Sequence, residues 1–131
     1  MSKQIPASHL DLVDGPVVVM LATVMADGMP QVTPVWISRH GNQIWVNSAK
    51  GRQKDLNLRN RPYATISATD PQNPYRWIEV RGSVVEIEEG AKADEHIEAM
   101  SQHYVGAPFN TTPGEKRVIY KIEPRKVNVG G

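Results

Sequence analysis

The chain has 131 residues, and 15 Lys and Arg against 14 Asp and Glu leave a formal net charge of +1 at pH 7. A length within roughly 100–200 residues predicts one domain over residues 1–131, and the balanced charge argues against a general binder of polyanions. The chain contains no cysteine, which excludes disulfides, thiolate metal sites and a cysteine nucleophile and fits a reducing cytoplasm. We therefore expect a cytoplasmic domain without a metal site.

Six segments carry the β-branched or alternating pattern that is typical of strands. In chain order they are Val17–Val24, Gln31–Ile37, Gln43–Asn47, Tyr63–Thr69, Tyr75–Glu86 and Lys116–Glu123. Asp27-Gly28 is a hairpin signal between the first two strands, and Pro34 indicates an edge strand or a bulge. The pattern predicts a mainly β protein with short helices, built as a six-stranded antiparallel barrel. A homodimer would cover its free edges and apolar faces.

Three helices are predicted, one before the first strand and two between strands. Residues 6–14 suit a short helix that is capped by Ser8, and residues 51–60 suit a second helix that ends before Pro62. Ala91–Tyr104 is amphipathic, with Ile97 and Met100 among its inward positions. His96 and His103 lie on the same helix, and we expect both to be solvated.

The second predicted helix begins with a concentration of positive charge. Lys50, Arg52 and Lys54 lie in its opening turn or just before it. This placement opposes the helix dipole, which favours anions at an N-terminus, so an anionic ligand is expected to bind there. Lys50 and Lys54 are spaced one helical turn apart on one face. The alternative is an ordinary solvated basic face.

Several short segments, in their order along the chain, resemble those of the flavin- and deazaflavin-dependent split-barrel oxidoreductases, the superfamily of pyridoxamine phosphate oxidase. The resemblance spans roughly residues 16–129. Its pieces are Leu21-Ala22-Thr23, Pro30–Trp36, Val46-Asn47-Ser48, Lys50–Leu58 and Asn73–Gly82. Tyr104–Phe109 and Pro113-Gly114-Glu115 are similar to one branch, the small reductases that use the deazaflavin coenzyme F420.

The resemblance implies a homodimer with two cofactor sites at its interface. It places one strand along the tricyclic ring, which here is represented by Gln31, Thr33, Pro34, Val35 and Trp36. It places the ribityl phosphate against a strand end and a basic segment, here Val46, Asn47, Ser48, Lys50, Gln53, Lys54 and Asn57. Arg76 and Trp77 are expected to reach the site of the partner subunit. Each of the tryptophans Trp36, Trp45 and Trp77 is equally a plausible core residue.

Three function classes follow from the resemblance. The first is an F420-dependent reductase that passes a hydride to an electron-poor double bond of a small organic substrate. The second is an FMN-binding flavoprotein of the same barrel, and the third is a non-enzymatic flavin or deazaflavin carrier. Nucleic-acid binding is disfavoured, because no aromatic residue lies between Val46 and Pro62 to stack on bases. Because the ring would carry the hydride, no catalytic side chain is assigned, although Tyr75, Arg76 or a water could supply a proton.

Overall fold

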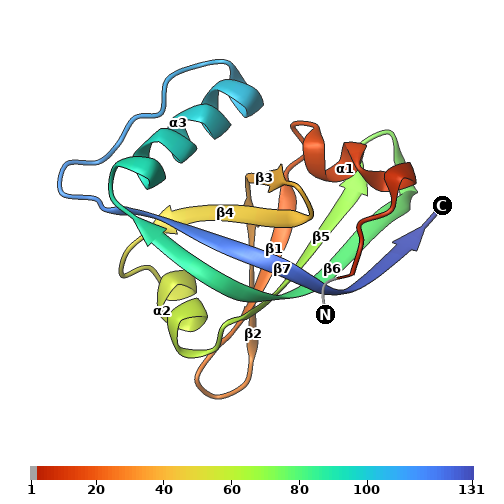
Figure 1. Cartoon of the computed structure of the whole chain (residues 1–131), viewed down its shortest axis with the longest axis horizontal. Helices are drawn as coiled ribbons and strands as arrows, with labels where there is room; N and C mark the ends of the chain where they lie inside the picture. The colour runs from red at the N-terminus through yellow and green to blue at the C-terminus, as the bar shows by residue number, and fades with distance from the viewer. Residues whose placement is uncertain (1–2) are drawn as a thin grey trace.

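The computed structural model describes residues 3–131 and consists of one curled antiparallel sheet with short helices around it (Figure 1). Its strands are β1 (Val19–Val24), β2 (Pro30–Val35), β3 (Ile37–His40), β4 (Gln43–Ala49), β5 (Tyr63–Asp70), β6 (Asn73–Glu89) and β7 (Arg117–Gly130). Its helices are η1 (Ala7–His9), α1 (Asp11–Asp14), α2 (Gln53–Asn60) and α3 (Ala91–Val105).

The two edges of the sheet are connected by the polypeptide chain itself and not by hydrogen bonds between strands. The strand order is β2-β1-β5-β6-β7-β4-β3, so the two edge strands, β2 and β3, follow each other in sequence with only Trp36 between them. The predicted single strand Gln31–Ile37 is therefore two strands, because its first part pairs with β1 and its last residue, Ile37, pairs with β4. The predicted antiparallel split barrel is confirmed, with seven strands in its sheet.

The two longest strands, β6 and β7, lie side by side and run the length of the molecule (Figure 1). Their pairing shifts register between Arg81 and Gly82. A Cβ at Gly82 would lie 2.5 Å from Ile122 Cγ2, so only glycine allows the strands to approach this closely. β7 continues through Val127 and Val129, as the extended tail predicted, and β6 begins two residues earlier than expected.

The core lies inside the curl of the sheet. Alternate residues of several strands point into it, such as Val19 and Leu21 of β1 and Ile78 and Val80 of β6. Both faces of β7 are covered at its start, where four consecutive residues from Arg117 to Tyr120 are buried. The run of buried positions therefore replaces the alternation that is expected for a half-exposed strand.

The helices differ from the prediction at two points. The expected helix over residues 6–14 is divided into η1 and α1, and Ser8 does not cap it because its hydroxyl contacts His9 Nδ1 instead. On α3, which covers one end of the sheet on the opposite side from α2 (Figure 1), His96 is only 8% exposed. The expectation that His96 is solvated is wrong, because it lies among the inward positions Ala93, Ile97 and Met100.

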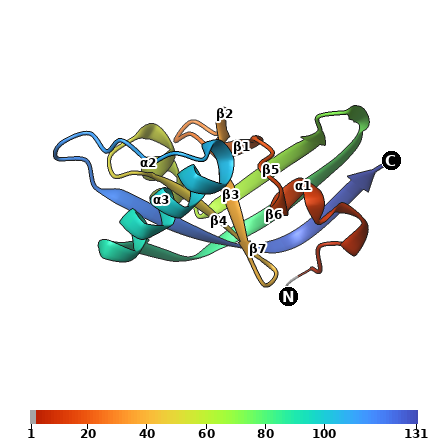
Figure 2. The ribbon, with the colours of Figure 1, turned by 90° about the horizontal axis from the view of Figure 1, so that it is seen from above.

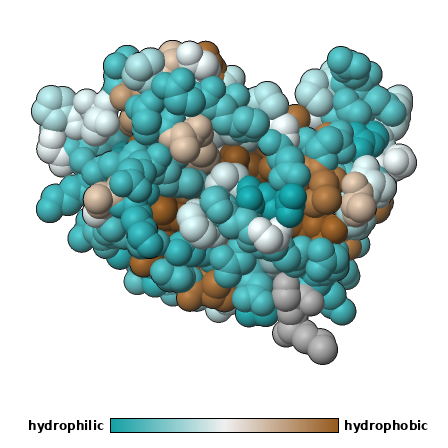
Figure 3. Space-filling model, turned by 45° about the horizontal axis from the view of Figure 1, so that its top comes forward, coloured by the Kyte–Doolittle hydropathy of each residue, from teal (hydrophilic) through white to brown (hydrophobic). Residues whose placement is uncertain are grey.

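A view from above shows α3 and α1 at different ends of the sheet (Figure 2). The surface, seen from a direction between those of Figures 1 and 2, has a notch between two raised lobes, with hydrophobic residues exposed along it (Figure 3). In the described part of the chain no helix has the length and apolar character that crossing a membrane requires.

Candidate functional site

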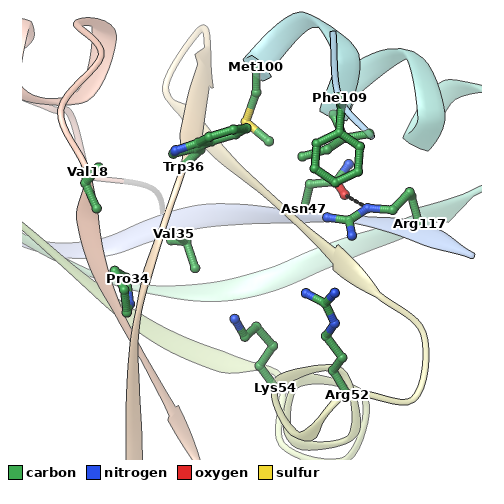
Figure 4. A pocket seen from close by; sticks show the side chains of 11 residues that line it. Val18, Pro34, Val35, Trp36, Asn47, Arg52, Lys54, Met100, Phe109 and Arg117 are labelled. Atoms are coloured by element: carbon green, nitrogen blue, oxygen red, sulfur yellow. Dashed lines mark hydrogen bonds between the residues drawn. The ribbon is translucent and has the colours of Figure 1, made fainter. Parts of the chain in front are cut away.

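A cleft lies where the junction between β2 and β3 faces the start of α2 and the middle of α3 (Figure 4). Its volume is about 410 Å³. The lining residues are Val18, Pro34, Val35, Trp36, Asn47, Arg52, Lys54, Ile97, Met100, Phe109 and Arg117. Cationic side chains gather at one side and apolar ones at the other, so the cleft is divided into two chemically different halves.

Three cations face the cleft from two elements. Arg52 and Lys54 come from the start of α2, and Arg117 comes from the start of β7 (Figure 4). Lys54 is half-buried, and burial together with the charges of Arg52 and Arg117 lowers the pKa of its ammonium. Lys54 has no hydrogen-bond or ion-pair partner among residues 3–131. Like charges of this kind accumulate where an anion is to be bound.

Arg117 is held rigidly beside these two cations. Its Nε donates to Asn47 Oδ1 at 2.9 Å, its Nη1 pairs with Glu115, and its guanidinium lies 5.0 Å from the centre of the Phe109 ring. The side chain is 5% exposed. These three contacts fix the guanidinium plane, so Arg117 presents a preorganised charge to the cleft.

The start of α2 is positioned by a buried carboxylate. Asp55 accepts hydrogen bonds from Gly51 N at 2.9 Å, from Arg59 Nε at 2.8 Å and from the hydroxyl of Tyr120. Burial would raise the pKa of Asp55, but the bonds from Gly51, Tyr120 and Arg59 outweigh it and lower the pKa. This negative charge in the first turn offsets the unfavourable placement of the cations at the helix N-terminus.

The apolar half of the cleft is organised by Trp36. Its ring stacks on Tyr104 of α3, with centroids 5.3 Å apart and an angle of 17° between the planes. The Tyr104 hydroxyl accepts from Ile37 N at 3.1 Å and donates to Val17 O at 3.0 Å. Tyr104 therefore ties α3 to both sides of the β2–β3 junction, and the resulting wall suits a flat apolar ring.

The structure brings five of the predicted cofactor-binding residues together in this cleft, and they are Pro34, Val35, Trp36, Asn47 and Lys54. The other nine lie outside its lining: Gln31, Thr33, Val46, Ser48, Lys50, Gln53, Asn57, Arg76 and Trp77. For these nine residues, contact with a ligand through the backbone or from a partner subunit stays a prediction.

Several of the nine have contacts that explain their position. The side chains of Val46 and Ser48 are buried, and the Ser48 hydroxyl has no partner among the described residues. Lys50 precedes α2, and its Nζ lies 3.3 Å from Glu89. The expectation that Lys50 and Lys54 share one face of a helix is therefore wrong, since α2 begins only at Gln53. Asn57 is buried, and its amide donates to Thr23.

Arg76 and Trp77 lie on β6, outside the cleft. Arg76 forms ion pairs with Asp11 at 2.6 Å and Asp70 at 3.1 Å, which raise its pKa, the bond to Asp11 contributing most. Trp77 is 37% exposed. Their role in the site of a partner subunit stays a prediction.

Sequence reasoning missed Arg117, Met100 and Phe109 as lining residues. Arg117 is more than sixty residues away from Lys54, so no local spacing connects the two. The available signal was a charged residue directly before the apolar run Val118-Ile119-Tyr120. Met100 was predicted to face inward, and it does so at the point where α3 covers the cleft.

Fold and cleft together define a split-barrel protein whose cleft has a cationic half and an aromatic half. The model of the pyridoxamine 5'-phosphate oxidase family matches residues 5–129, and the chain belongs to this family. No curated protein is similar enough to match the sequence. Within residues 3–131 no group of three or more His, Asp or Glu is arranged to hold a metal ion.

Solved structures extend this result. An F420 reductase is 32% identical, with a TM-score of 0.84, and the match covers 95% of this chain and 98% of that one. A conserved hypothetical protein from Mycobacterium tuberculosis is 24% identical, with a TM-score of 0.79, 98% of this chain and 86% of that one being covered. The heme storage protein HutZ from Vibrio cholerae is 12% identical, with a TM-score of 0.66 and coverage of 98% and 96%. The last two likenesses show the fold alone.

Proposed function

We propose that the chain is an F420-dependent oxidoreductase, and that the cleft between α2 and α3 holds the coenzyme. The observation that carries this proposal is the group of three cations, in which Lys54 is half-buried and has no partner among residues 3–131. A phosphodiester needs such charge-assisted donors. The 32% identity to an F420 reductase favours the deazaflavin over FMN.

The residues present fit a cofactor with an anionic arm and a flat ring. Lys54, Arg52 and Arg117 would hold the phosphate, and Arg52, which is the most exposed of the three, could also follow an oligoglutamate tail. Trp36 and Phe109 would line the ring and exclude water from it. When bound, the reduced deazaflavin supplies a hydride for an electron-poor double bond of a small organic substrate. No side chain is assigned as the proton donor.

The proposed assembly is a homodimer that pairs through the outer face of β1 and β2. Val18 and Val32 are each 53% exposed on this face, and Met20 is 43% exposed. Pro34, which is paired with Met20, and Val18, which directly precedes β1, also line the cleft. A partner that covers the face would therefore also close the open side of the cleft, and its Arg76 and Trp77 could contribute there. We place the dimer in the cytoplasm, which suits a chain without cysteine.

A binding titration with two cofactors tests the proposal. The purified cofactor-free protein is titrated with F420 and, separately, with FMN, and binding is followed by fluorescence. Tight binding of F420 and weak binding of FMN would support the proposal, and activity with the reduced coenzyme and electron-poor alkenes would then separate a reductase from a carrier. Preferential binding of FMN would support the second candidate, a flavoprotein of the same family. Binding of neither would contradict both.

A further inference from the structure

A hydrogen-bonded chain of side chains leads from the cleft through the protein to its surface. Arg117 Nε donates to Asn47 Oδ1 at 2.9 Å, and Asn47 Nδ2 lies 3.1 Å from His96 Nδ1. His96 Nε2 lies 2.7 Å from the hydroxyl of Ser38, which in turn lies 2.8 Å from His40 Nε2. Asn47, His96 and Arg117 are all buried, whereas His40 is exposed.

The direction of this chain is set by its buried end. A guanidinium has only donors, so Asn47 must turn its amide oxygen toward Arg117 and its NH₂ toward His96. His96 Nδ1 must then accept, which assigns the neutral tautomer with the proton on Nε2, donating to Ser38. Burial, together with the charges of His40, Arg117 and Lys121, lowers the pKa of His96 to about 4, so the ring is neutral near pH 7.

The amide of Asn47 has one further contact. Its Nδ2 also donates to the carbonyl of Ala93 at 3.0 Å, so both hydrogens of the NH₂ group have acceptors when His96 is present. Loss of the imidazole nitrogen would leave one of these hydrogens buried and unpaired. The nitrogen side of the amide would then be held by Ala93 alone, so the orientation of its oxygen toward Arg117 would be less tightly fixed.

We infer that His96 is a positioning residue for the cleft: it fixes the amide of Asn47, and through it the guanidinium that faces the ligand. The identity of the ligand in this inference rests on the proposed function, whereas the hydrogen-bond geometry around His96 does not. Although His96 does not line the cleft, a change at it should therefore alter the binding of an anionic cofactor.

Two variants of His96 separate positioning from mere packing. His96→Asn places an amide oxygen near the position of Nδ1, and so keeps an acceptor for Asn47. His96→Leu fills similar space without an acceptor. We expect His96→Leu to raise the dissociation constant for F420 about tenfold and His96→Asn to restore most of the affinity. His103→Phe is the control on the same helix, because it keeps the edge-on ring contact with Tyr104 and removes the hydrogen bond to the backbone oxygen of Asp14, outside the network.

Equal affinities for the leucine and asparagine variants, or unchanged affinity in both, would overturn the inference. A measurement on the unmodified protein makes it independent of variant folding and of the cofactor. The ¹⁵N chemical shifts of the histidine side chains should show one ring with unprotonated Nδ1 and protonated Nε2 at neutral pH, and its assignment to His96 supports the inference. The opposite tautomer would contradict it. If the protein binds no F420, the proposed function fails while this measurement still decides the geometry.

Discussion

Lys54 brings a positive charge into a half-buried cleft beside Arg52 and Arg117, which lower the pKa of its ammonium together with burial. Glu115 pairs with both arginines, whereas the Lys54 ammonium has no anionic partner among residues 3–131, so binding of an anion should be coupled to this residue. We expect Lys54→Ala to weaken F420 binding by about 1–3 kcal/mol, as for the loss of a charge-assisted hydrogen bond, with little change in stability. Fluorescence titration measures the affinity.

The control for this change is Lys92→Ala, because Lys92 is exposed and pairs with Glu88 outside the cleft. Lys50→Ala tests whether the anion binds at both Lys50 and Lys54, as the sequence predicts, or in the cleft beside Lys54. Since Lys50 pairs with Glu89, we expect its removal to cost much less affinity than that of Lys54. Equal losses at the two lysines would contradict the assignment of the anion to the cleft.

His96 also makes stability depend on pH. Its pKa is lowered from 6.5 to about 4 in the folded protein, chiefly by burial, so the unfolded chain binds the proton more readily between these values. Stability is therefore complete above about pH 6.5 and falls as the pH drops toward 4, by up to about 3 kcal/mol. Urea unfolding across this range should show the decline, and His96→Asn should flatten it. An equally steep decline in the variant would contradict a neutral buried His96.

At the level of elements, the position of α2 depends on the contact between Asp55 and Tyr120 of β7. Tyr120 is fully buried, and burial and Asp55 raise the pKa of its phenol far above its ordinary value, so the hydroxyl stays a donor. Tyr120→Phe should lower the free energy of unfolding by about 1–3 kcal/mol, because it removes one donor from a buried carboxylate. Urea unfolding measures this. Tyr63→Phe, at an exposed position of β5, should change stability little.

The same elements show what local sequence can and cannot predict. The strands and helices follow from periodicity and turn residues within a few positions, because these signals are local. The break at Trp36 has no such signal, since it depends on which distant strands β2 and β3 pair with. Likewise, Lys54 could be identified from the charge at the start of α2, whereas Arg117 joins it only through pairing of β4 with β7. His96 was misjudged although its spacing from Ala93 and Met100 places it on the inward face.

For the whole molecule, the outer face of β1 and β2 connects assembly with function. Met20 of β1, Val32 of β2 and Val18, directly before β1, expose apolar side chains there. Val32 is the better site for a charge, because it lies on this face without lining the cleft. We expect Val32→Lys to shift a dimer toward monomer, since a lysine that is buried in an interface loses its hydration without gaining a partner.

Light scattering at micromolar concentration measures this shift, and F420 titration of the same sample tests its consequence. Because Val18 and Pro34 lie at the border of the face and the cleft, separation of the subunits should open the cleft and weaken cofactor binding as well. Gln102→Lys, which adds the same charge on the exposed side of α3, should change neither property. A monomeric unmodified protein that binds F420 tightly would show that one chain holds the cofactor alone. Arg76 and Trp77 would then have no part in the site.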